Sequence, residues 1–108
     1  MNTYLLSGNY LGADGNKGLL TEGGTSRKAT IEKLAASLGG KATSIYYAFG
    51  ETDIYAIAEM PDDASMAAVA LAARSSGLVN VKTIPLLSPE VIDEAAKKLP
   101  NYRGPGKE

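Results

Sequence analysis

The chain has 108 residues, a length that fits a single domain. It contains neither cysteine nor histidine, which excludes disulfides, thiolate metal sites, thiol nucleophiles and histidine general bases. The net charge is −1 and no cluster of Lys and Arg stands out, so we expect no nucleic-acid partner. The sequence shows no apolar run of the ~18–20 residues that a membrane span needs and no signal-peptide pattern. We therefore expect a cytoplasmic protein with no membrane partner and no cofactor.

The first half of the chain predicts one strand and one helical region. Residues 3–10 alternate in the manner of a strand, and the glycine-containing segment 11–15 that follows predicts a loop. Ile31, Leu34, Ala35 and Leu38 have the spacing of one apolar helix stripe. A first helical piece around residues 17–20 would be broken or bent at Gly23-Gly24.

The second half predicts a hairpin, a helix, a strand and a last helix. Residues 42–49 and 53–60 read as two strands joined by a short turn. A helix then follows Pro61 and ends near Ser76, and residues 78–87 form a further strand. Ser88-Pro89-Glu90 has the pattern of a helix start, and Pro100 ends that helix.

The resulting order, β-α-β-β-α-β plus a C-terminal helix, predicts an α+β domain with a ferredoxin-like split βαβ plan and an antiparallel sheet. We expect this single domain to span residues 1–99 and residues 100–108 to form a flexible tail. Helices should cover one face of the sheet and leave the other face free.

Two features suggest self-association. Residues 64–73 carry no charge and are apolar nearly all round, which indicates either tolerated surface alanines or a second covered helix face. Both faces of the strands also carry large residues, for example Tyr46 beside Tyr47. A homodimer formed through the open sheet face would explain the second feature.

Several short turn and cap segments of the chain form a recognisable set. The turn between the two hairpin strands reads Gly50-Glu51-Thr52-Asp53. The other segments are Glu22-Gly23-Gly24-Thr25-Ser26-Arg27, Leu38-Gly39-Gly40-Lys41, Pro61-Asp62-Asp63, Ser75-Ser76-Gly77 and Pro85-Leu86-Leu87-Ser88-Pro89-Glu90. With this set the chain resembles the GYD-domain family, although Thr52 stands where the family name implies tyrosine. The resemblance implies a bacterial-type small protein that forms a dimeric α+β barrel of ferredoxin-like units. It implies no particular reaction, because relatives by fold alone include monooxygenases, isomerases, cyclases and regulatory domains.

Aromatic residues are the first candidates for a binding site. Tyr10, Tyr46, Tyr47, Phe49 and Tyr55 all fall on predicted strands. Tyrosine rings can line a ligand cleft and offer a hydroxyl at its edge. The alternative is that they fill the core or a dimer interface, since aromatic residues are common in strands.

Arg27 and Asp53 are the charged candidates. Arg27 follows the predicted helix bend and could hold a carboxylate or an enolate, or could simply pair with Asp53 or Glu51 at the surface. Asp53 could act as a base if its environment were apolar, or could cap a turn through backbone amides. The glycine pair near Arg27 lacks the spacing of a phosphate-binding loop.

These residues support three hypotheses. The first is a homodimeric small-molecule-binding protein whose ligand lies between sheet and helices, lined by strand tyrosines with Arg27 nearby. The second is a cofactor-independent enzyme in which Arg27 stabilises an oxyanion and Asp53 or a tyrosine moves a proton. The third is an interaction module that docks a partner on the apolar helix 64–73.

Overall fold

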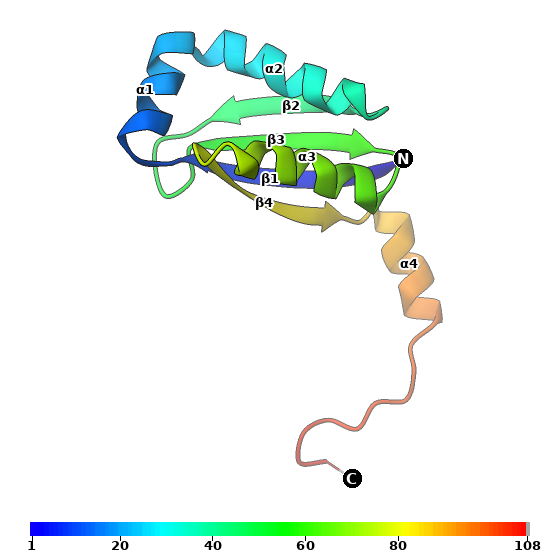
Figure 1. The fold of residues 1–108 in the computed structure, drawn as a ribbon. Helices are drawn as coiled ribbons and strands as arrows, with labels where there is room; N and C mark the ends of the chain where they lie inside the picture. The colour runs from blue at the N-terminus through cyan, green and yellow to red at the C-terminus, as the bar shows by residue number, and fades with distance from the viewer. Residues whose placement is uncertain (108) are drawn as a thin grey trace.

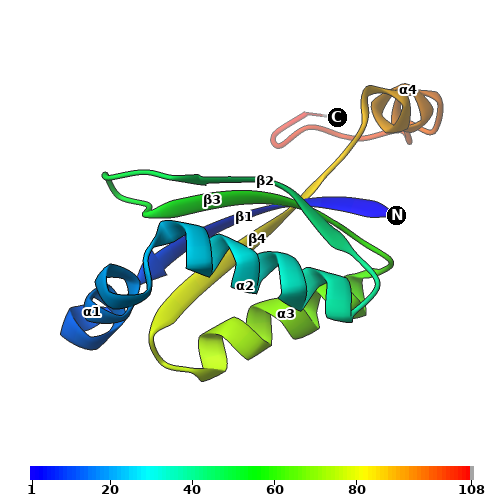
Figure 2. The ribbon, with the colours of Figure 1, turned by 90° about the horizontal axis from the view of Figure 1, so that it is seen from above.

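The computed structural model describes residues 1–107 and shows four strands and four helices (Figure 1). Their bounds are β1 Asn2–Tyr10, α1 Gly12–Glu22, α2 Gly24–Ser37, β2 Lys41–Tyr47, β3 Ile54–Met60, α3 Asp63–Ser75, β4 Val79–Leu86 and α4 Pro89–Lys97. The strands form one antiparallel sheet in the order β2-β3-β1-β4. Helices α2 and α3 lie side by side on one face of this sheet (Figure 2). The predicted ferredoxin-like α+β fold is confirmed.

The core lies between the sheet and the two long helices. Alternation along β1 turns Tyr4, Leu6, Gly8 and Tyr10 toward the helices, as the period of a strand requires. A buried cluster joins both layers of the fold and consists of Tyr4, Ala35, Met60, Met66 and Val69. The hydroxyl of Tyr4 donates a short hydrogen bond to Asp63 at the start of α3, so the buried phenol is satisfied.

Helix α1 corrects the sequence prediction, because the expected loop 11–15 lies mostly within this helix. The backbone N–H of Leu11 donates to the carbonyl of Leu78 over 2.8 Å and so fixes the start of the helix against β4. Gly15 packs directly on that same carbonyl, where a Cβ atom would collide. Gly15 therefore serves close packing here, which the sequence pattern alone does not reveal.

The predicted break between two helical pieces is confirmed at Gly23. This residue has φ 87° and separates α1 from α2, and its N–H donates to the carbonyl of Leu19 over 2.7 Å. A left-handed φ favours glycine, because it lacks a Cβ atom. The chain thus changes direction between the two helices at a single residue.

The strand predicted over residues 42–49 is shifted in the structure. β2 ends at Tyr47, and the predicted strand residue Phe49 lies fully exposed in the turn that follows. A bulge between Ala42 and Ser44 also removes Thr43 from the regular ladder, and its hydroxyl donates to the carbonyl of Ile57 over 3.2 Å. The expected alternation therefore holds only from Ser44 onward.

The C-terminal helix α4 stands apart from the rest of the fold (Figure 1). Ser88 caps it by accepting a hydrogen bond from the N–H of Val91, with Pro89 at the first helical position, as predicted. The radius of gyration is 17.4 Å, whereas a compact chain of this length would have about 13 Å. After α4, residues 98–107 form neither helix nor strand. The predicted tail also includes Glu108, which lies outside the described residues, and its flexibility stays a prediction.

None of the four helices within residues 1–107 combines the length and the apolar character needed to cross a lipid bilayer.

Candidate functional site

A cavity of about 390 Å³ lies between the sheet and helices α1, α2 and α3. Its walls come from β1, β3, β4 and all three of these helices, so residues far apart in the sequence meet around it. Aliphatic side chains form most of the wall, among them Leu6, Leu19, Leu34, Ile54, Val69 and Val81. A volume near 400 Å³ lies within the range of small-molecule sites in proteins.

Small residues on the walls leave this space open. Gly8 lines the cavity from β1, in a series that otherwise presents Tyr4, Leu6 and Tyr10 to the helices. Gly18 on α1 and Ala73 on α3 contribute to the opposite walls. A Cβ atom added at Gly18 would meet nothing within 4 Å. The helices therefore pack onto the sheet around the cavity without filling it.

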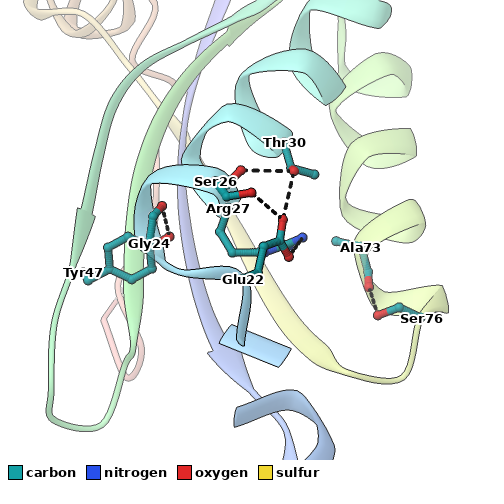
Figure 3. A network of polar contacts seen from close by, with 8 residues as sticks. All are labelled: Glu22, Gly24, Ser26, Arg27, Thr30, Tyr47, Ala73 and Ser76. Carbon is teal, nitrogen blue, oxygen red and sulfur yellow. Dashed lines mark hydrogen bonds and ion pairs between the residues drawn. The ribbon is translucent and has the colours of Figure 1, made fainter. Parts of the chain in front are cut away.

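Arg27 provides the positive charge on the cavity wall (Figure 3). Its Nη1 lies 3.7 Å from Oε2 of Glu22. Its Nε atom is buried and has no hydrogen-bond partner within residues 1–107. A buried N–H without a partner is unfavourable, so this donor is free to bind an oxygen atom brought by a ligand.

Glu22 is held in place by the first turns of α2. Its Oε1 accepts hydrogen bonds from the hydroxyls of Ser26 at 3.1 Å and of Thr30 at 3.5 Å (Figure 3). The Thr30 hydroxyl also lies 3.2 Å from the carbonyl of Ser26. Glu22 is thus an anchored acid, and the guanidinium of Arg27 contacts it with only one of its nitrogens.

Two of the predicted tyrosines lie at this end of the fold. Tyr10 is buried and lines the cavity. Tyr47 lies outside the cavity, where its hydroxyl donates to the carbonyl of Gly24 over 2.9 Å (Figure 3). Burial raises the pKa of Tyr47 to about 12, and the neighbouring Tyr10 adds to this rise. The Tyr47 hydroxyl therefore stays protonated near neutral pH and serves as a hydrogen-bond donor, not as a base.

Asp53 lies at the end of the sheet and does not line the cavity. Its Oδ2 accepts a hydrogen bond from the N–H of Tyr10 over 3.0 Å. Its own N–H donates to the carbonyl of Gly8 and to Oδ1 of Asn9, each over 3.0 Å. The carboxylate therefore joins the turn before β3 to the end of β1, which matches the turn-capping alternative.

Tyr46 and Tyr55 face away from the helices. They are directly opposite each other on β2 and β3 and are 73% and 43% exposed. Of the six candidate residues, the structure thus brings Tyr10 and Arg27 to the cavity. It places Tyr47 next to Gly24, Asp53 at the strand end, and the remaining two on the open face of the sheet.

Sequence reasoning missed the aliphatic wall, the anchoring of Glu22 and the role of Gly8. Gly8 did carry a signal, because it interrupts large residues on the helix-facing side of a central strand. The structure also contains no group of three or more acidic side chains close enough to hold a metal ion within residues 1–107.

The comparison with protein-family models decides the family. The model of the GYD domain matches residues 4–96 of the 108-residue chain. The chain belongs to the GYD domain family. No curated protein and no solved structure matched it. The GYD domain as matched includes β1 from Tyr4 onward, strands β2 to β4, helices α1 to α3 and α4 up to residue 96. It therefore contains all the residues that line the cavity.

Proposed function

We propose that this GYD-domain chain binds a small, mainly aliphatic molecule with an anionic end group in the cavity between sheet and helices. The observation that carries this proposal is the unfilled cavity of about 390 Å³ with a mainly aliphatic wall. Burial of apolar surface is the main favourable term for such a ligand, at about 0.8 kcal/mol for each buried CH₂ group.

The volume suggests the size of the ligand. At ~30 Å³ for each water-sized unit, the cavity holds roughly a dozen non-hydrogen atoms. A straight or branched monocarboxylic acid of about ten carbons has this size. Larger ring systems would need the helices to move.

The end group is inferred from Arg27. Arg27 lines this mainly aliphatic cavity together with Glu22. Its Nε has no hydrogen-bond partner within residues 1–107, and its Nη1 lies 3.7 Å from Oε2 of Glu22. A guanidinium can bind a carboxylate through two parallel hydrogen bonds, which gives both affinity and orientation. The hydrocarbon part of the ligand would then lie against the aliphatic side chains of the cavity wall.

The positions of the other candidates favour binding over catalysis. Asp53 is engaged with backbone groups outside the cavity, and Tyr47 has a pKa of about 12. The proposed role is therefore to hold, carry or sense the ligand.

Titration calorimetry with decanoate and 1-decanol tests the proposal, because these probes differ only in the end group. We expect decanoate to bind more tightly. Arg27→Met should weaken decanoate binding about tenfold, which corresponds to ~1.4 kcal/mol, and should leave decanol binding unchanged. Equal binding of both probes with no effect of this substitution would contradict the anionic end group.

A second pair of variants tests the cavity itself. Ala73→Leu fills part of the wall, whereas Ala68→Leu makes the same change at an exposed position of α3 outside the cavity. We expect only Ala73→Leu to reduce the affinity for both probes. If neither probe binds, or if both variants behave alike, the cavity is not the binding site.

A further inference from the structure

The cavity between sheet and helices is lined by one acidic and one basic side chain, those of Glu22 and Arg27. The other lining residues within residues 1–107 are uncharged. The two charges cancel, so the empty site is neutral as a whole. A ligand whose only charge is a carboxylate would bind near Arg27 but would also lie near the carboxylate of Glu22, which repels it.

The break between α1 and α2 brings these two side chains together. Glu22 is the last residue of α1, and Arg27 lies near the start of α2. On a continuous helix they would not be neighbours, because side chains meet three or four positions apart and not five. Gly23, with φ 87°, interrupts the helix between them. Figure 3 shows the two side chains next to each other.

Neither member of this pair satisfies the other. Nη1 of Arg27 and Oε2 of Glu22 are 3.7 Å apart, which is longer than a hydrogen bond. Nε of Arg27 has no hydrogen-bond partner within residues 1–107. The hydroxyls of Ser26 and Thr30 donate to Oε1 of Glu22 and not to Oε2. The pair therefore offers a donor and an acceptor side by side.

We propose that the ligand is a free amino acid with a long aliphatic side chain, whose carboxylate binds Arg27 and whose ammonium group binds Glu22. This inference rests on the ligand site proposed above and specifies its end group. Both groups of an amino acid are attached to one carbon, so they can meet two protein groups that are 3.7 Å apart. The ammonium group also balances the charge of Glu22, and the occupied site stays neutral. A peptide terminus carries only one of the two groups and does not match the pair.

The exposure of the pair fits such a ligand. The side chains of Arg27 and Glu22 are 26% and 38% exposed, whereas Tyr10 and Val69 on the same wall are buried. The charged end of the amino acid can therefore stay in contact with water while its hydrocarbon part is buried. Because water also screens the charges, we expect the ammonium group to change the affinity by about fivefold.

Titration calorimetry with decanoate, 2-hydroxydecanoate and 2-aminodecanoate tests the proposal, because these probes differ only at the carbon next to the carboxylate. We expect 2-aminodecanoate to bind about fivefold more tightly than decanoate. The affinity for 2-hydroxydecanoate should lie between these two, since its hydroxyl can donate to Glu22 but carries no charge. Arg27→Met should weaken the binding of all three probes.

Glu22→Gln should separate the probes. This substitution removes the charge but keeps a side-chain oxygen that can accept from Ser26 and Thr30. The affinity for 2-aminodecanoate should fall about fivefold, whereas the affinity for decanoate should rise because the repulsion is removed. Glu32→Gln makes the same change at an exposed position of α2 outside the cavity and should alter neither affinity. If Glu22→Gln does not fold, the order of the three probes on the wild type still decides.

Three results would overturn this inference and leave the proposed ligand site intact. The first is that decanoate binds at least as tightly as 2-aminodecanoate. The second is that 2-hydroxydecanoate binds as tightly as 2-aminodecanoate, since the charge of the ammonium group would then contribute nothing. The third is that Glu22→Gln shifts the affinities for decanoate and 2-aminodecanoate in the same direction. Failure of every probe to bind would instead overturn the ligand site and this inference together.

Discussion

The carboxylate of Asp53 and the backbone N–H of Tyr10 are joined by a hydrogen bond of 3.0 Å across the end of the sheet. Tyr10 is the last residue of β1 and also lines the cavity, whereas Asp53 is the last residue before β3. This contact therefore links the turn that carries the family motif to the end of β1. The aspartate holds the wall of the cavity without entering it.

Asp53→Ala should lower the free energy of unfolding by about 1–2 kcal/mol, because the N–H of Tyr10 loses a charged acceptor. Asp53→Asn keeps one side-chain oxygen as an acceptor and should cost less. Urea denaturation of the three proteins measures the difference. If Asp53→Ala had unchanged stability and yet no ligand binding, the carboxylate would have a direct role that its position does not suggest.

Gly15→Ala and Gly18→Ala make the same change in the same helix and should have opposite effects. A Cβ atom at Gly15 would collide with the carbonyl of Leu78, so we expect a loss of about 2–3 kcal/mol. Gly18 has open space at that position, so alanine should stabilise α1 by about 0.5–1 kcal/mol. Thermal unfolding of both variants checks this prediction. Equal destabilisation would show that α1 does not pack on Leu78 as described.

The raised pKa of Tyr47 predicts a loss of stability in alkaline solution. An unfolded tyrosine ionises near pH 10.0, whereas burial and the neighbouring Tyr10 keep folded Tyr47 protonated up to about pH 12. The folded state thus binds one more proton between these values, and its stability falls as the pH rises from 10 toward 12. Below pH 10 this contribution is fully present.

Tyr47→Phe should remove this part of the alkaline decline, and denaturant unfolding at a series of pH values measures it. Tyr102→Phe is a suitable control, since it removes an exposed ring from the C-terminal segment without affecting β2. An unchanged alkaline slope in Tyr47→Phe would contradict the assignment.

Asp62 should give the opposite pH dependence. Its side chain caps α3 and accepts a hydrogen bond of 2.7 Å from the N–H of Ser65, which lowers the pKa of the carboxyl group. Stability from this cap is present above the unfolded pKa and is lost as the pH falls through the folded value. Asp62→Ala should therefore lower the melting temperature near neutral pH more than Asp93→Ala, an exposed control on α4. In strong acid the melting temperatures of the two variants should lie below that of the wild type by similar amounts.

The elements that follow a simple period could be predicted from the sequence. The alternation of Tyr4, Leu6 and Tyr10 and the stripe of Ile31, Leu34 and Ala35 both reflect burial on one side, so each appears in a single segment. The cap at Ser88 is equally local.

The remaining features depend on contacts between distant segments. Gly15 resembles a loop residue until the carbonyl of Leu78 is placed against it. The cavity is the space that three helices leave unfilled above Gly8 when they pack on the sheet. The sequence of a single segment does not predict such a space. For the same reason the positions of the tyrosines could be predicted only in part. Strand alternation places Tyr46 and Tyr47 on opposite faces of the sheet, but the bulge before Ser44 determines which of them faces the helices.

The cavity is bordered by residues whose side chains are small or absent, Gly18 on α1 and Ala73 on α3. Each lies on a regular helix. A larger side chain at either position would shorten the space available to the ligand by about one carbon for each added carbon, and the backbone would stay in place. Arg27 lies on α2, so substitutions on α1 and α3 leave it in place. Relatives of this chain could thus acquire preferences for shorter or longer molecules through single substitutions at these two positions while recognition of the end group stays constant. The preference for the length of the ligand and the preference for its end group would therefore evolve independently within one binding site.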